Sequence, residues 1–137
     1  MSPTPLDRVV LIDDDRLDIK FQSRAIERTG LAHEIKTFMM AEDALAWFRQ
    51  EGPDAADLVF LDINMPSMDG FEMLDVATRE FGERFSSAVV MMLTTSLDPS
   101  DKEKADSYTM VRDFIPKSLT SEKFRGLVEK MQQDRAA

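Results

Sequence analysis

A chain of 137 residues, of which 43% are apolar, is long and apolar enough to fold as one domain. It contains no cysteine, which excludes disulfides, thiolate metal sites and cysteine nucleophiles. Its net charge of −9 argues against direct binding to nucleic acid or to an anionic membrane, because such a surface repels phosphate groups. No apolar run approaches the roughly 20 residues that span a bilayer and no signal peptide is visible, so we expect a cytoplasmic location.

Short apolar runs alternate with helical patterns five times along the chain. A continuous apolar run predicts a strand that is buried on both faces, and apolar residues three or four positions apart predict an amphipathic helix. Glycine and proline mark several ends, as Thr29-Gly30 and Gly52-Pro53 do. The predicted strands cover residues 9–12, 34–39, 58–62, 88–93 and 111–115, and the predicted helices cover residues 16–28, 41–50, 70–81, 99–107 and 120–133.

This alternation implies a parallel sheet with helices on both faces, because right-handed crossovers lead to that arrangement. The predicted fold class is therefore α/β, with a doubly wound five-stranded parallel sheet and five helices. We expect the domain to cover residues 7–131, between short tails at 1–6 and 132–137. The pairs Met39-Met40 and Met91-Met92 lie on or beside strands and are interpreted as core filler.

Two helices have apolar patterns that make specific predictions. In the first helix, Leu17, Phe21 and Ala25 are spaced four apart, which predicts that they share the inward face. The fourth helix is highly charged and has Ala105 as its one obvious inward residue, so it is predicted to be marginal and mobile. Three aspartates stand where helices begin and are predicted helix caps: Asp15, Asp69 and Asp98.

Polar residues follow four of the five predicted strands. The first strand ends in Asp13-Asp14-Asp15, the third in Asp62, the fourth in Thr94 and the fifth in Pro116-Lys117. In an open parallel sheet the carboxyl ends of the strands form the site, so these side chains should converge. Taken alone, Asp62 could be a helix cap, a metal ligand or a nucleophile.

The chemistry of this set is that of a hard cation and a tetrahedral oxyanion. Carboxylates without histidine or cysteine favour Mg²⁺, or Mn²⁺ as a second hard cation. A hydroxyl and an ammonium beside them would neutralise a phosphoryl group, and an aspartate is an established phosphoryl acceptor.

The order and spacing of these motifs resemble the receiver domain of two-component response regulators, and the likeness covers about residues 7 to 131. It depends on the acidic pair after the first strand, the Met-Pro-x-x-Asp-Gly turn after Asp62, and the threonine and lysine that end the last two strands. The resemblance implies the flavodoxin-like strand order 2-1-3-4-5 and a single-domain, chemotaxis-type regulator.

In that family, Asp62 would be the phosphoacceptor, and Thr94 and Lys117 would bind the phosphoryl oxygens. Thr94 and Phe114 would move on phosphorylation as the switch residues. The metal ligands would be Asp13, Asp14, Asp62 and the backbone carbonyl of Asn64. One departure is that Ser118 follows the lysine, where the family usually has proline.

The resemblance also implies partners. A histidine kinase or a histidine phosphotransfer protein would donate the phosphoryl group and dock around Leu17, Asp18 and Phe21. A stand-alone regulator, monomeric or homodimeric, would then signal by protein contacts through the face formed by the fourth helix, fifth strand and fifth helix. It would not be an enzyme, beyond self-phosphorylation from small donors and slow autodephosphorylation.

Two alternatives remain at this stage. Asp13-x-Asp15 after an apolar strand resembles the nucleophile motif of haloacid-dehalogenase-type phosphatases, with Asp13 as nucleophile. That family needs another acidic metal motif after the lysine, where Glu122 is the near acidic residue, and it leaves Asp62 without a role. The other alternative is a receiver fold that acts as an unphosphorylated binding module.

Overall fold

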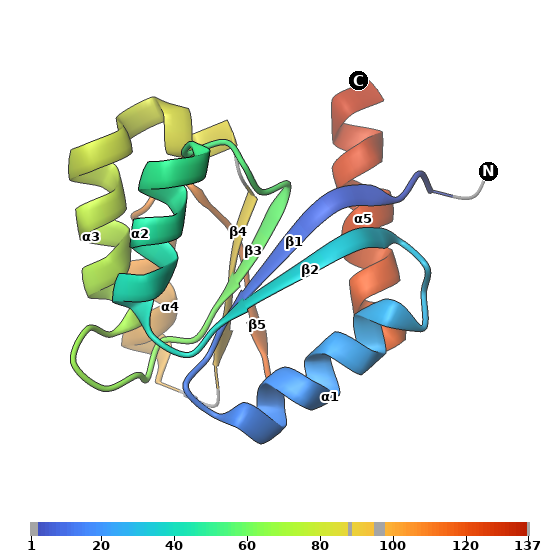
Figure 1. The fold of residues 1–137 in the computed structure, drawn as a ribbon, viewed down its shortest axis with the longest axis horizontal. Coiled ribbons are helices and arrows are strands. Elements are labelled where there is room, and N and C mark those ends of the chain that lie inside the picture. The colour runs from blue at the N-terminus through green and yellow to red at the C-terminus, as the bar shows by residue number, and fades with distance from the viewer. Residues whose placement is uncertain (1–2, 88, 95–97, 137) are drawn as a thin grey trace.

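A computed structural model describes the backbone of residues 3–87, 89–94 and 98–136, with side chains except at 86, 87, 89–94, 135 and 136. Five parallel strands form one sheet in the order β2-β1-β3-β4-β5, which confirms the predicted fold class (Figure 1). The elements are β1 (Leu6–Ile12), α1 (Arg16–Glu27), β2 (Ala32–Phe38), α2 (Ala41–Glu51), β3 (Leu58–Leu61), α3 (Gly70–Phe81), the 3-10 helix η1 (Gly82–Ser87), β4 (Val89–Thr94), α4 (Pro99–Asp106), β5 (Val111–Pro116) and α5 (Ser121–Ala136).

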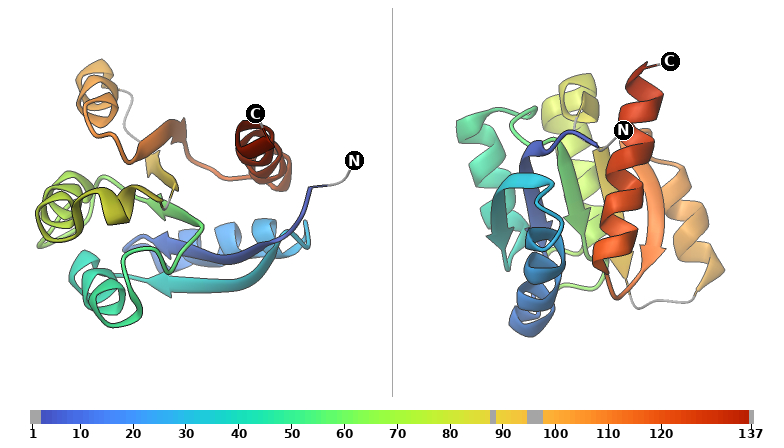
Figure 2. Two further views of the ribbon diagram at one scale, coloured as in Figure 1. Left: turned by 90° about the horizontal axis from the view of Figure 1, so that it is seen from above. Right: turned by 90° about the vertical axis from the view of Figure 1, so that its right-hand side faces the viewer.

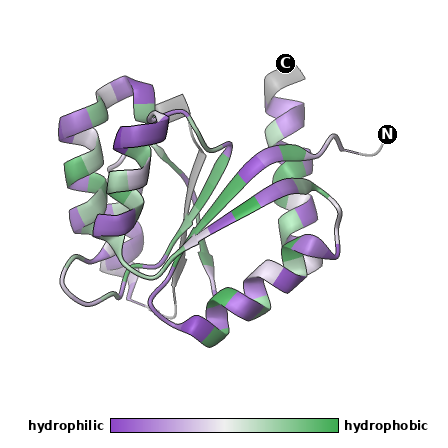
Figure 3. Cartoon of the chain, in the orientation of Figure 1, coloured by the Kyte–Doolittle hydropathy of each residue, from purple (hydrophilic) through white to green (hydrophobic). Residues whose placement is uncertain are grey.

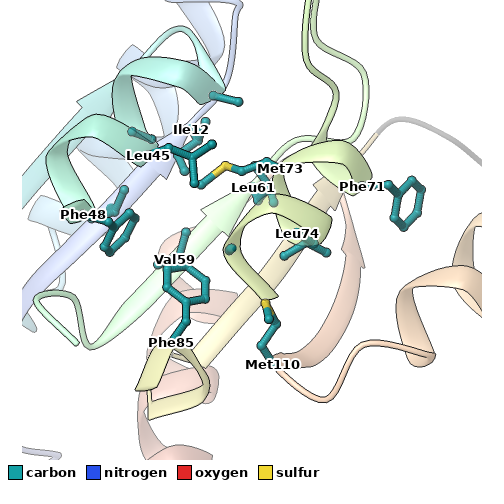
Figure 4. Packing of buried hydrophobic residues seen from close by; sticks show 14 of the residues in the cluster. Ile12, Leu45, Phe48, Val59, Leu61, Phe71, Met73, Leu74, Phe85 and Met110 are labelled. Atoms are coloured by element: carbon teal, nitrogen blue, oxygen red, sulfur yellow. The ribbon is translucent and has the colours of Figure 1, made fainter. Parts of the chain in front are cut away.

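Each face of the sheet carries its own apolar core, because successive side chains of a strand point to opposite faces. On one face, Ile12 and Leu61 belong to a buried cluster with residues of α2 and α3 (Figure 4). On the other face, Leu11 and Phe60 are buried with residues of α1 and α5. The two groups of helices flank the sheet in Figure 2, and the strands between them are mainly apolar in Figure 3. Burial on both faces explains why β1 and β3 read as continuous apolar runs.

The prediction that Leu17, Phe21 and Ala25 share the inward face of α1 is confirmed for Ala25 but wrong for the other two. Leu17 and Phe21 are 58% and 56% exposed, and α1 instead buries Gln22, Ala25 and Ile26. An α-helix turns about 100° per residue, so side chains four apart drift by about 40° and those eight apart by about 80°. Ala25 therefore reaches the core while Leu17, on the same apparent stripe, faces outward.

The predicted caps are confirmed at all three helices. Asp15 accepts hydrogen bonds from the backbone N–H groups of Leu17 and Asp18, and Asp69 forms a reciprocal capping box with Glu72. Asp98 accepts from the Ser100 N–H and precedes proline at the first turn of α4. These caps fix where α1, α3 and α4 begin, and so fix the loops at the carboxyl edge of the sheet.

The methionine interpretation is corrected in the loop between β2 and α2. Met39 and Met40 are 39% and 40% exposed and do not fill the core. They lie beyond the end of β2, an edge strand with a largely exposed face, so no second layer covers them. The side chains of Met91 and Met92 lie outside the described part of the structure.

Gly70, the first residue of α3, lies against the backbone of β3's carboxyl end. A Cβ atom at this position would come within 2.6 Å of the Asp62 carbonyl oxygen and 3.0 Å of the Ile63 Cα. The Gly70 N–H also donates to the Ile63 carbonyl at 2.9 Å. This glycine is therefore required for close approach between α3 and the Asp62 loop. The positive φ in the turn before it belongs to Ser67, at 66°.

Candidate functional site

The ends of β1 and β3 place two aspartates side by side. Ile12 pairs with Leu61 in parallel register, and the Asp62 N–H continues the ladder by donating to the Ile12 carbonyl at 3.0 Å. On the other side, the Asp13 N–H donates to the Phe38 carbonyl at 3.0 Å. Backbone hydrogen bonds of the sheet therefore hold Asp13 and Asp62 together at its carboxyl edge, the lower edge in Figure 1.

Three carboxylates meet at this edge. Asp13, Asp14 and Asp62 each offer an oxygen atom, and these oxygens lie within 4.8 Å of one another. Asp13 and Asp62 are 2% and 5% exposed, whereas Asp14 is exposed. Clustered carboxylate oxygens, two of them buried, are the donor set that a hard divalent cation prefers, so these residues fit Mg²⁺.

Lys117 brings a cation into the same cluster. Its Nζ lies 2.8 Å from Asp13 Oδ2, 2.7 Å from Asp18 Oδ2 and 3.2 Å from Asp62 Oδ2. The lysine side chain is 11% exposed, so the ammonium is held in the pocket and not on the open surface. The predicted convergence of β1, β3 and β5 is thus visible in the geometry of these side chains.

The electrostatics of the pocket raise two pKa values. Burial raises the pKa of Asp62 to about 6, and the neighbouring charge of Asp13 adds to this, while the Lys117 ammonium opposes it. For Lys117, burial lowers the pKa, but hydrogen bonds to Asp13 and Asp18 outweigh burial and leave the pKa above its ordinary value. Lys117 is therefore a fixed positive charge, and ionisation of Asp62 is less favourable than that of an ordinary aspartate.

Helix α1 contributes two contacts that the sequence analysis missed. Asp18 pairs with Lys117, and Gln22 is buried and donates from Nε2 to Asp13 Oδ2 at 3.2 Å. The Asp15 N–H donates to the other oxygen, Asp13 Oδ1, at 2.9 Å. The available signal was a polar glutamine on the face of α1 that carries Ala25, since a buried amide needs a hydrogen-bond partner.

The other predicted site residues differ in how they are placed. The Asn64 N–H donates to Asp62 Oδ1 at 3.3 Å, and its side chain is exposed. Phe114 is half-buried and packs against the core beneath α2 and α3. Thr94 is the last residue of β4, but its side chain lies outside the described part of the structure. The peptide bond between Lys117 and Ser118 is cis.

The comparisons with known proteins identify the class. The family model of the response regulator receiver domain matches residues 9–129. The chain therefore belongs to the response regulator receiver domain family of two-component signalling. Receiver domains are phosphoacceptor switches that bind Mg²⁺ at an acidic pocket and accept phosphoryl groups from histidine kinases or phosphotransfer proteins.

Two curated relatives cover most of this chain. It is 29% identical over 126 residues, 91% of its length, to "Hybrid signal transduction histidine kinase L" of Dictyostelium discoideum, but spans 7% of that protein. It is also 29% identical over 128 residues to "Probable methanogenesis regulatory protein FilR2" of Methanothrix harundinacea, covering 91% of this chain and 81% of that protein. The receiver domain thus occurs in relatives of very different length.

A solved structure supports the same fold. The "Two component response regulator from Cytophaga hutchinsonii" superposes with a TM-score of 0.86 at 27% identity, covering 94% of this chain and 98% of that one. Within the described residues, no helix combines the length and the hydropathy that crossing a bilayer requires.

Proposed function

We propose that Asp62 is the phosphoacceptor of this receiver domain and that a phosphohistidine is the donor. One observation carries the proposal: Asp62 is buried at the end of β3 with the Lys117 ammonium 3.2 Å from its Oδ2 and with Asp13 and Asp14 beside it. Of the three clustered aspartates, Asp62 is the one that follows β3, the central strand of the sheet. The backbone of Gly70 packs against this strand end.

The reaction is a phosphoryl transfer between the histidine and the aspartate. An oxygen of Asp62 attacks phosphorus, a P–O bond forms, and the P–N bond to the histidine breaks, with its electron pair returning to the imidazole. The Asn64 N–H, which donates to Asp62 Oδ1, leaves Oδ2 on the side of the lysine. Lys117 is placed to neutralise the charge of the transferred group.

Asp13, Asp14 and Asp62 are the proposed side-chain ligands of Mg²⁺, and the Asn64 carbonyl is the proposed backbone ligand. When bound, the cation would neutralise the carboxylates and the incoming phosphoryl charge. Without a bound cation, the clustered carboxylates repel one another and destabilise the folded protein. The effect of Mg²⁺ on the melting temperature measures this repulsion.

We expect millimolar Mg²⁺ to raise the melting temperature of the wild-type protein by several degrees, because binding to the folded state relieves that repulsion. The measurement is thermal unfolding with Mg²⁺ or with chelator. Asp14→Asn should lose most of the gain, while Asp43→Asn, which changes an exposed aspartate of α2, should keep it. An equal gain in all three proteins would count against the proposed ligands.

The phosphoacceptor is tested with acetyl phosphate and Mg²⁺. We expect an adduct of one phosphoryl group on the peptide that contains Asp62, located by mass spectrometry after borohydride reduction. Asp62→Asn should abolish the adduct, because an amide cannot accept the group. Asp57→Asn removes a carboxylate at the opposite, amino end of β3, where it accepts hydrogen bonds from the Asp7 and Arg8 N–H groups, and should be labelled like the wild type.

The same experiment separates the phosphatase alternative. In that reading Asp13 is the nucleophile, so labelling would survive Asp62→Asn and vanish in Asp13→Asn. Asp13 is more tightly held than Asp62: it has three partners, the Asp15 N–H, Gln22 and Lys117, whereas Asp62 has one partner on each oxygen, the Asn64 N–H and Lys117. An unphosphorylated binding module would show no adduct on either residue.

For the output, we propose the face of α4, β5 and α5, with Thr94 and Phe114 as switch residues. Helix α4 buries Ala105, and its end is tied to α3 by the Tyr108 hydroxyl, which donates to Asp75 at 2.7 Å, and by stacking of Tyr108 on Phe71. The Lys104 ammonium also lies over the Phe71 ring, 4.6 Å from its centroid. We propose that α4 shifts on these side-chain contacts with α3 when the pocket changes charge. The donor protein would dock on α1, where Leu17 and Phe21 are exposed.

A further inference from the structure

The Lys117 ammonium has three carboxylate partners, so no N–H group is left for a phosphoryl oxygen. An ammonium has three N–H donors. Its Nζ lies within 3.2 Å of the Oδ2 atoms of Asp13, Asp18 and Asp62, and the shortest of these distances, 2.7 Å, is to Asp18. A phosphoryl oxygen can therefore bind this ammonium only after one carboxylate gives up its place.

The three carboxylates are not equally free to leave. Asp13 is almost fully buried and is also held by Gln22 and by the Asp15 N–H. Asp62 is the proposed acceptor itself. Asp18 is different, because its side chain is 35% exposed and lies on the first turn of α1, where water can solvate the carboxylate once it is released.

We propose that Asp18 is a positioning residue that holds the Lys117 ammonium on the α1 side of the pocket and competes with the phosphoryl group for it. The inference rests on the proposed function of Asp62. Asp18 is not needed to keep the lysine in the pocket, since Asp13 at 2.8 Å and Asp62 at 3.2 Å remain as partners. Its negative charge therefore acts mainly against the arriving anion, and it slows phosphorylation.

The first test measures phosphorylation by acetyl phosphate at saturating Mg²⁺, as the second-order rate constant of adduct formation. We expect Asp18→Asn to be phosphorylated about twofold to fivefold faster, the range that a partly exposed ion pair supports. Asp18→Glu, which restores the charge, should return toward the wild-type rate. Glu27→Gln removes the same charge from the exposed far end of α1 and should leave the rate unchanged.

A structural role would show instead as lost stability, so the melting temperatures of these variants are measured in parallel and should stay within about 2 °C of the wild type. An unchanged or slower rate in Asp18→Asn would overturn the inference. A wild-type protein that forms no adduct on Asp62 would refute the proposed function, which is a different result.

The second test needs no phosphodonor. The Lys117 ammonium is followed by its ¹⁵Nζ resonance in selectively labelled protein at low temperature. We expect the resonance to shift in Asp18→Asn and to stay in place in Glu27→Gln, because only the first variant removes a negative charge from beside the ammonium. A resonance that stays in place in Asp18→Asn would show that the pair is not formed in solution, and would overturn the inference independently of phosphorylation.

Discussion

Lys117→Ala should lower the free energy of unfolding by about 3 kcal/mol at pH 8 in the absence of metal, because it leaves buried carboxylates without their cation. Asp13 and Asp62 are 2% and 5% exposed, so water compensates their charges poorly when the ammonium is lost. The loss should shrink at pH 5, since Asp62, whose pKa is raised to about 6 even beside the lysine, then takes up a proton. Lys117 itself stays charged over this range, because its pKa lies above the ordinary value.

Urea unfolding at the two pH values measures this effect. Lys20→Ala, an exposed lysine on α1, is the matched control and should change stability by less than about 0.5 kcal/mol. A loss below about 1 kcal/mol for Lys117→Ala at pH 8 would mean that the carboxylates are compensated by other groups, and that the ammonium is not central to the pocket.

Asp62→Asn should have the opposite effect and make the metal-free protein more stable by about 2 kcal/mol at pH 7.5. Burial and the charge of Asp13 raise the pKa of Asp62 to about 6, above the ordinary value near 4 in the unfolded chain. The folded state thus binds the proton more tightly, so this carboxyl favours folding below about pH 4 and its contribution is lost as pH rises through about 6. Asparagine does not ionise and avoids the loss.

The stability difference between Asp62→Asn and the wild type should therefore be full at pH 7.5 and close to zero at pH 4. Chemical unfolding in chelator across this range gives the difference directly. Glu51→Gln, an exposed carboxylate on α2, should show no such dependence. A variant that is less stable than the wild type at pH 7.5 would mean that the hydrogen bonds of Asp62 outweigh its desolvation.

The sequence predicted the strand-end cluster because the physics behind it is simple. Parallel strands run in one direction, so the residues at the carboxyl ends of the predicted strands 9–12, 58–62 and 111–115 lie at one edge of the sheet. This holds for any conformation of the connecting loops. Lys117 and Asp62 therefore reach the same edge, where their side chains make contact although β4 lies between their strands. The same reasoning could not reach the Asp18 contact, because it depends on how α1 is rotated about its axis.

That rotation is set by few residues, and the apolar pattern of α1 is misleading. Leu17 and Phe21 follow helical spacing, yet the face that meets the sheet is fixed by Ala25, Ile26 and the amide of Gln22. A polar residue is buried there because Asp13 accepts its hydrogen bond, which hydrophobic periodicity does not register. The apolar residues left outside form an exposed surface beside the pocket.

Gly70 has a consequence for how the pocket tolerates change. Gly70 does not have a positive φ, so its role is not dihedral freedom; its missing side chain lets α3 rest on the Asp62 carbonyl. A methyl group added there would have to move either the helix or the backbone of the proposed acceptor. The position of the proposed nucleophile is thus set in part by a residue with no side chain. A substitution of Gly70 would disturb the site although this residue takes no part in the chemistry.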